Sequence, residues 1–219
     1  STTGELRFTQ PGIASGFDHD FEEVSPHYGK VLLEDYDVIT EYTITDHVLF
    51  YRFTYPGGSK AQILIGNNTK VEIVGESSIR GVENRGLNVW FHAEFSEPFE
   101  ASGTWKNGVA DPAETSQSGR EIGAYAGFSP KQGDQVLVKI GISYISAEQA
   151  KANLDTEIPG WEFEEVKVEA RKTWNEALNR IRVEGGTEKQ RTIFYTSLYR
   201  ALSRMTNITE YGRYYSGFD

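Results

Sequence analysis

The segment KVLLEDYDVITEYTITDHVLFYRFTYPGG, residues 30–58, contains the pattern that decides the fold of this chain. Large apolar residues recur at about every second position, as at Val31, Leu33 and Val38. This two-residue period is typical of β-strands that bury one face. The apolar stretch 48–55 then stops at Pro-Gly-Gly, which is a strong turn signal.

Short segments of the same kind continue along the chain as far as Tyr144, at residues 60–66, 70–75, 87–95, 99–106, 121–128 and 135–144. Turn signals such as Asn67-Asn68 and Asn107-Gly108 separate them. About eight to ten short strands with regular turns predict an antiparallel β-sandwich or a related double-sheet fold. Because no helical period lies between these strands, the pattern argues against a βαβ architecture.

The pattern changes from strands to helices at Ser146. Ser146 and Gln149 have the spacing of a helix capping box, and so do Thr187 and Gln190. Between these two starts, apolar residues recur every three or four positions from Phe163 to Ile181, which predicts a helix that ends at Gly185-Gly186. The fold class is therefore predicted as mainly β with a C-terminal α part.

The helix predicted from residue 187 has an unusually broad apolar face. The face is formed by Ile193, Phe194, Ser197, Leu198, Ala201, Leu202 and Met205. A face of this width needs helical neighbours, and the chain has too few helices to supply them. We therefore expect this helix to be the first part of a larger helical domain.

Charge and composition exclude several classes of function. The net charge of −10 and the lack of Lys- or Arg-rich runs argue against binding to nucleic acid or to an anionic membrane. The chain has no cysteine, which excludes disulfides and thiol catalysis, and no apolar run approaches the ~18 residues of a membrane span. The start, STTGELRF, has neither a signal peptide nor an initiator Met, so we expect it to be processed or truncated.

Histidines and acidic residues are the first candidates for a chemical site. The segment FDHDFEE, residues 17–23, surrounds His19 with four carboxylates, yet it lacks an established metal-ligand spacing, so a solvated acidic loop is expected. His47 and His92 are expected to be structural. Glu162, Glu164 and Glu165 fall in the first turn of a predicted helix, where the helix dipole favours negative charge.

Several ordered motifs add a family resemblance. Residues 136–202, which contain EIPGWEF and VEGGTEKQRTIFYTSLYRAL, and residues 212–219, GRYYSGFD, resemble the glycoside hydrolase family 92 α-mannosidases. Residues 26–56 and the segment VWFHAEFSEPF, residues 89–99, also resemble regions of that family. The resemblance therefore covers nearly the whole chain.

The resemblance implies a fold, an activity and a location. Family members are mostly bacterial, exported, exo-acting and calcium-dependent, and many remove α-1,2-linked mannose with inversion. They consist of an N-terminal β-sandwich, a helical linker and an (α/α)6 barrel, with the active site between sandwich and barrel. In this chain those parts are residues 1–145, residues 146–186 and, for the start of the barrel, residues 187–219. We expect a periplasmic or extracellular enzyme whose partners are a mannose-containing glycan and the rest of its own barrel.

The resemblance also implies where the site residues lie. The catalytic carboxylates and most calcium ligands of the family come from the barrel beyond this chain, so no catalytic or metal-binding residue is assigned, and the fragment alone is expected to be inactive. Asp219 matches the aspartate of the family's GRY-x-G-x-D motif, which implies a contact to a sugar hydroxyl in the −1 subsite. Phe218 would form part of the wall of that subsite. The alternative for Asp219 is a role in a helix cap or turn.

Two other functions remain open from the sequence. A stand-alone carbohydrate-binding β-sandwich would use surface aromatic residues such as Trp90, Trp105 or Tyr125. A structural or assembly domain would bind no ligand. His19 stands where many family members have FSHE, and the resemblance implies no role for it.

Overall fold

The structure is a computed structural model that describes residues 1–9, 12–84, 86–204 and 207–217. The helices are α1 (Ala147–Glu157), α2 (Phe163–Leu178) and α3 (Glu188–Leu202), with one 3-10 turn η1 (His19–Phe21). The strands are β1 (Thr2–Thr3), β2 (Glu23–Ser25), β3 (Tyr28–Leu33), β4 (Val38–Ile44), β5 (Val48–Thr54), β6 (Ala61–Val74), β7 (Ser78–Asn84), β8 (Asn88–Phe95), β9 (Ala101–Lys106), β10 (Val109–Asp111), β11 (Ser116–Phe128), β12 (Gln135–Ser143), β13 (Thr209–Glu210) and β14 (Arg213–Tyr214). The predicted order, an antiparallel β domain followed by helices, is confirmed.

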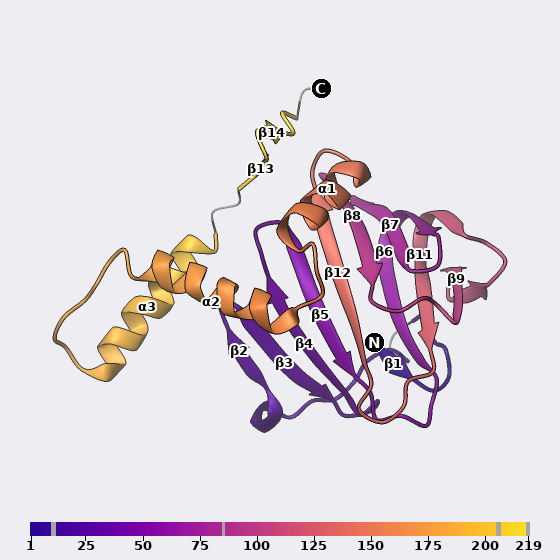
Figure 1. Ribbon diagram of the computed structural model, residues 1–219, viewed down its shortest axis with the longest axis horizontal. Coiled ribbons are helices and arrows are strands. Elements are labelled where there is room, and N and C mark those ends of the chain that lie inside the picture. Colours follow the sequence, from indigo (N-terminus) through magenta and orange to yellow (C-terminus); the bar gives the residue numbers. More distant parts are fainter. Residues whose placement is uncertain (10–11, 85, 205–206, 218–219) are drawn as a thin grey trace.

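The first twelve strands form one hydrogen-bonded antiparallel sheet (Figure 1). Its strand order is β10-β9-β11-β6-β7-β8-β12-β5-β4-β3-β2, with β1 paired to β6 beside this path. The late strands β11 and β12 insert between strands that come earlier in the chain. As a result β12 lies in the middle of the sheet, and the helices that follow it start from the centre of the β domain.

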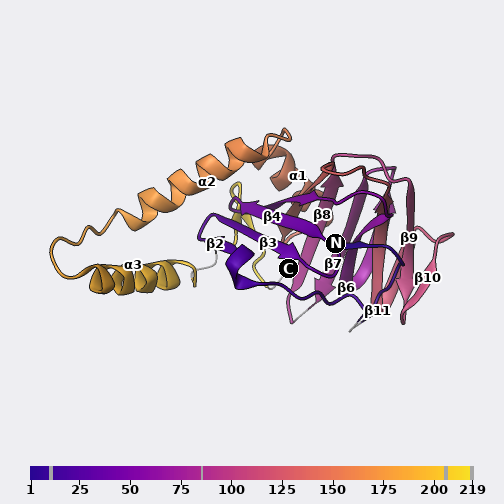
Figure 2. The ribbon, with the colours of Figure 1, turned by 90° about the horizontal axis from the view of Figure 1, so that it is seen from below.

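The sheet curls around one large core. Alternate side chains on a strand point to opposite faces, and on β5 Phe53 joins this core while Phe50 faces the other way. The same core contains Val38 from β4 and Ile122 from β11, which are far apart in the strand order. The two ends of the sheet must therefore enclose the core between them, which is the double-layer arrangement predicted. Figure 2 shows the change of strand direction from β3 and β4 to β9 and β11.

The outer face of the sheet is covered by α1 and the start of α2 (Figure 2). Leu154, Ile158 and Phe163 pack there against Phe50 in a second buried cluster. At Gly141 on β12 the approach is so close that an added Cβ would lie 2.3 Å from the carbonyl oxygen of Ala150. Only glycine permits this distance, so the residue fixes how closely α1 sits on the sheet.

The two strands predicted over residues 60–66 and 70–75 form the single strand β6, so that prediction is wrong. Asn67 adopts a left-handed conformation with φ of 64°, and the pairing of β6 with β11 shifts register opposite it. Asparagine is favoured in this conformation both in turns and in bulges. Here the chain bulges and continues in the same direction instead of turning back.

Helix α2 is shorter than predicted, because it ends at Leu178 and not at Gly185-Gly186. Its buried residues, Phe163 and Ala170, both lie in the half that packs on the sheet. Beyond that half, Asn179, Ile181 and Val183 are weak helix formers and gain no packing. Ile181, predicted to belong to the helix stripe, lies outside the helix and is exposed.

Helix α3 extends away from the sheet beside α2 (Figure 2). It begins with the predicted capping box of Thr187 and Gln190 and contains no buried residue. Its aromatic contact to α2 joins Tyr199 and Trp174, with ring centroids 5.1 Å apart. Ile193 on the predicted apolar face is 56% exposed. None of the helices within the described residues has the length and apolar character needed to cross a bilayer.

Candidate functional site

A cavity of about 840 Å³ lies where the end of the sheet, the helices and the C-terminal hairpin meet. We call it the junction pocket. Its walls include Ile44 and His47 from the β4–β5 region, Glu157 from α1, Trp174 from α2, Leu202 from α3 and Glu210 from the β13–β14 hairpin. The pocket therefore collects side chains from parts of the sequence that are far apart.

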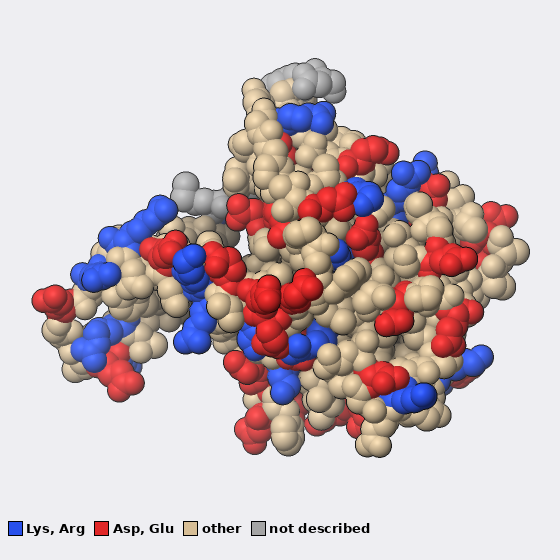
Figure 3. Space-filling view, viewed as in Figure 1, with Lys and Arg blue, Asp and Glu red and all other residues tan. Residues whose placement is uncertain are grey.

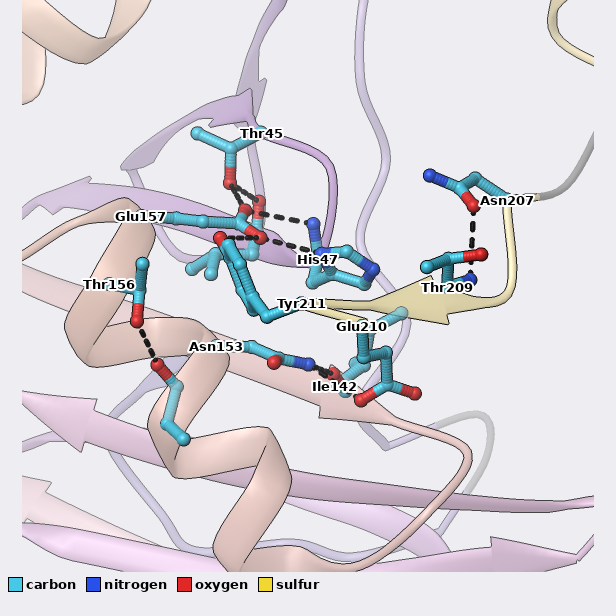
Figure 4. A network of polar contacts seen from close by, with 12 residues as sticks. Thr45, His47, Ile142, Asn153, Thr156, Glu157, Asn207, Thr209, Glu210 and Tyr211 are labelled. Carbon is cyan, nitrogen blue, oxygen red and sulfur yellow. Dashed lines mark hydrogen bonds and ion pairs between the residues drawn. The ribbon is translucent and has the colours of Figure 1, made fainter. Parts of the chain in front are cut away.

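Glu157, the last residue of α1, organises one side of the junction pocket (Figure 4). One carboxylate oxygen accepts hydrogen bonds from the Thr45 hydroxyl and, at 2.9 Å, from the His47 backbone N–H. The other accepts from His47 Nδ1 at 2.6 Å and from the Tyr211 hydroxyl at 3.0 Å. Burial alone would raise the pKa of Glu157, but these hydrogen bonds lower it below the usual value. The carboxylate is therefore held in its ionised form.

His47 is oriented by this carboxylate. Its side chain is only 10% exposed, and Nδ1 carries the proton because the carboxylate of Glu157 can only accept. Nε2 is buried and has no hydrogen-bond partner among the residues described. The structure thus places His47 at the strand corner where it was expected, in contact with a residue 110 positions further along the chain.

Glu210 organises the other side and is completely buried. Its carboxylate accepts a hydrogen bond from the Tyr144 backbone N–H at 2.9 Å. It accepts another from Asn153 Nδ2 at 2.8 Å, and Figure 4 shows these two side chains. Asn153 also accepts a hydrogen bond from Gln149, and Gln149 in turn accepts one from Arg213. A continuous polar network therefore joins the hairpin to α1 and to the end of β12.

Neither Glu157 nor Glu210 was singled out as a site residue from the sequence. For Glu157 there was a signal, because a carboxylate at the C-terminal end of a helix opposes the helix dipole unless it has partners elsewhere. Glu210 gives no local signal, since its donors lie 57 and 66 residues earlier in the chain. Of the acidic residues in the first turn of α2, Glu164 forms an ion pair with Arg52 at 2.7 Å.

The site residues predicted from the sequence fall in different places. Asp219 and Phe218 lie outside the described residues, so their predicted roles stay predictions. His19 lies on the surface in η1, with Nδ1 2.7 Å from Glu22. Across the described ranges, no group of three or more His, Cys, Asp or Glu side chains could hold a metal ion.

The surface aromatics of the carbohydrate-binding alternative are mostly buried. Trp105 and Tyr125 belong to the core, and Phe8 stacks on Trp105 with ring centroids 4.8 Å apart. Trp90 is half-buried. Trp105 and Tyr125 therefore do not form the exposed sugar platform that this alternative requires. On the face shown in Figure 3, acidic and basic side chains are interspersed over the sheet and the helices.

Comparison with known proteins gives two adjacent family matches. The Glycosyl hydrolase family 92 N-terminal domain matches residues 1–143, and the Glycosyl hydrolase family 92 catalytic domain matches residues 149–219. The chain belongs to glycosyl hydrolase family 92. The polar network of the junction pocket joins both parts of this family 92 chain, because Thr45 and His47 lie in the first match while Glu157, Glu210 and Tyr211 lie in the second.

The chain is similar to solved structures of family 92 enzymes and to one curated glycosidase. An alpha-mannosidase of family 92 from Bacteroides thetaiotaomicron is 27% identical, with a TM-score of 0.82 over 91% of this chain and 30% of its own. An inverting mannosidase of the family from strain VPI-5482 of that organism has a TM-score of 0.84 at 24% identity, over 91% of this chain and 28% of its own. An uncharacterized secreted glycosidase from Arthroderma benhamiae is 25% identical over 90% of this chain and 30% of its own length. The family 92 chain spans less than a third of the length of each of these relatives.

Proposed function

We propose that the chain is the N-terminal portion of an exo-acting, calcium-dependent α-mannosidase that hydrolyses its substrate with inversion. The proposed substrate is α-1,2-linked mannose in glycans or mannan. The observation that carries this proposal is the pair of family 92 matches, which follow each other along a chain similar to an alpha-mannosidase over 91% of its length.

We do not assign the catalytic pair to Glu157 and Glu210, the two carboxylates of the polar network. Inversion requires a general acid and a general base about 6.5–9.5 Å apart, with room for a water molecule. Glu210 is buried, the Glu157 side chain is only 9% exposed, and both oxygens of each already accept hydrogen bonds. They are therefore suited to holding structure and not to exchanging protons with a substrate. We place the acid and the base in the part of the catalytic domain outside this chain.

Calcium and the sugar are proposed to bind largely outside the described residues as well. Because the described ranges offer no cluster of metal ligands, we assign calcium no step here. Asp219 remains the proposed sugar contact, since a carboxylate forms strong hydrogen bonds with hydroxyl groups. Phe218 remains the proposed wall residue beside it.

We further propose that the protein is exported. A relative 25% identical to this chain is named as a secreted glycosidase. Export would bring the enzyme to glycans outside the cytoplasm, which suits an enzyme that removes terminal sugars from mannan or glycoproteins.

The test is hydrolysis of α-mannosides by a longer form of the protein that includes the rest of the catalytic domain. We expect it to release mannose from α-1,2-mannobiose, to lose activity with EDTA, and to regain it with Ca²⁺. Proton NMR of the first product should show β-mannose, as inversion requires. The 219-residue chain alone should show no hydrolysis. Activity on other glycosides but not on any α-mannoside would overturn the substrate assignment.

A further inference from the structure

The hairpin β13–β14 is held in place mainly by polar side chains. Tyr211 and Tyr214 are 56% and 62% exposed, so the hairpin buries little apolar surface. A two-stranded hairpin of this size is at best marginally stable alone. Its position must therefore depend on the few hydrogen bonds that tie it to the rest of the protein.

The turn of the hairpin contains an unfavourable residue whose side chain makes one of these bonds. Tyr211 and Gly212 both have positive φ, 51° and 83°, as in a type I′ turn. Asn, Asp or Gly is preferred at the first of these positions, and a tyrosine there is strained. The Tyr211 hydroxyl donates to Glu157, and burial together with this bond raises the pKa of Tyr211 to about 12. It therefore stays a donor at any physiological pH.

Two further links hold the hairpin on either side of this turn. Before it, the buried carboxylate of Glu210 accepts from the Tyr144 backbone and from Asn153. After it, Arg213 Nη1 donates to Gln149 Oε1 at 2.8 Å. All three links lead to α1 or to the end of β12, and α1 is itself seated on the sheet at Gly141. The hairpin is therefore fixed relative to the β domain at three successive points.

We propose that Glu157 and Glu210 are positioning residues that set the place of the 209–214 hairpin relative to the β domain. This inference rests on the proposed function, because the hairpin belongs to the part of the chain that matches the catalytic domain. Neither glutamate is assigned a contact with the substrate. Their effect on catalysis comes from keeping the hairpin in its productive place.

The first measurement tests the anchoring without using activity. In the 219-residue chain, Tyr211→Phe and Glu157→Gln should speed amide hydrogen exchange within residues 209–214 by at least about fivefold, because the open hairpin becomes more populated. Tyr215→Phe is the matched control, since the structure shows no hydrogen bond from its hydroxyl to the described residues. Exchange in β12 should not change. Equal exchange in Tyr211→Phe and in the control would overturn the proposal.

The second measurement uses the longer protein. Because misplacement by about 1 Å can cost up to 10²-fold in rate, Tyr211→Phe and Glu210→Gln should lower kcat on an α-mannoside by about tenfold or more. Tyr215→Phe should keep the kcat of the unmodified enzyme. If Glu210→Gln does not fold, Tyr211→Phe alone tests the proposal. That variant should fold, because it removes only one exposed hydroxyl. A fall in kcat that only follows the folded fraction of the variant would contradict a positioning role.

If the unmodified enzyme cleaves no α-mannoside, the proposed function fails. The hydrogen-exchange experiment would then still test whether the two glutamates anchor the hairpin.

Discussion

At the scale of single residues, Glu157 shows how one carboxylate can connect three parts of a chain. It accepts four hydrogen bonds, from a threonine, from both donors of His47 and from a tyrosine in the C-terminal hairpin. Removing such a group leaves several buried donors without an acceptor, which costs more than the loss of one average hydrogen bond. Its contribution must also depend on its ionisation.

The pH dependence of stability should reveal this contribution. The folded-state pKa of Glu157 is lowered, so its stabilising effect is present above the unfolded value of about 4.5 and is lost as pH falls through the lower folded value. We expect Glu157→Gln to lower the free energy of unfolding by about 1–3 kcal/mol at pH 7. The difference should shrink as the pH is lowered below 4.5. Urea unfolding of both proteins from pH 3 to pH 8 measures it, with exposed Glu176→Gln as the control. A difference that does not vary with pH would contradict this account.

At the scale of elements, the seating of α1 on β12 determines where everything after the sheet begins. The helix approaches the strand at Gly141, and its far end supplies Glu157 to the junction pocket. A small shift of α1 on the strand would also displace Glu157 and so disturb the polar network. The contact at Gly141 therefore helps to position the C-terminal part of the chain as well as to pack α1 on the sheet.

A side chain at Gly141 should disturb this seating. In Gly141→Ala the new Cβ would meet the Ala150 carbonyl at 2.3 Å and the Leu154 Cβ at 2.9 Å, so α1 must move. Overpacking of this kind costs about 1–3 kcal/mol, and we expect that loss in urea unfolding. Gly16→Ala is the control, because its Cβ would lie 3.4 Å from the flexible side chain of Glu34. An unchanged free energy of unfolding in Gly141→Ala would show that α1 can pack on the sheet in another position at no cost.

At the scale of the whole molecule, the β domain and the helices differ in how fully their apolar side chains are buried. The β domain has a closed core, whereas α3 buries no residue and leaves Ile193 exposed. The described residues likewise contain no cluster of metal ligands. Under the proposed function, the exposed face of α3 packs against further helices of the catalytic domain, and calcium binds in that same part.

Calcium should therefore affect the stability of the 219-residue chain and of the longer protein differently. A ligand stabilises a fold only if it binds the folded state, and a concentration of about 100 times Kd adds about 2.7 kcal/mol. We expect Ca²⁺ to leave the Tm of the 219-residue chain unchanged and to raise that of the longer protein. Thermal unfolding with Ca²⁺, with Mg²⁺ and with EDTA makes the comparison. A Ca²⁺-specific rise in the Tm of the short chain would mean that it holds a site of its own.

Much of this architecture could be predicted from the sequence, because strands and helices leave periodic patterns. The two-residue period located most of the long strands but missed β7, and the capping residues Ser146 and Thr187 marked helix starts that the structure confirms. Asn67 was misread because turns and bulges share its conformation. The end of α2 was missed because it depends on where the sheet stops supporting the helix. The polar network could not be predicted, since Glu210 and its donors come together only in the folded chain.

The polar network also limits how relatives of this chain can be recombined. A chimera with its crossover between residues 143 and 149, where the two family matches meet, would take Thr45 and His47 from one parent and Glu157 from the other. A crossover anywhere between residues 157 and 210 would still divide Glu157 from Tyr211. The two parts are separate in sequence classification but are coupled by these contacts, so we expect them to have diverged as one unit.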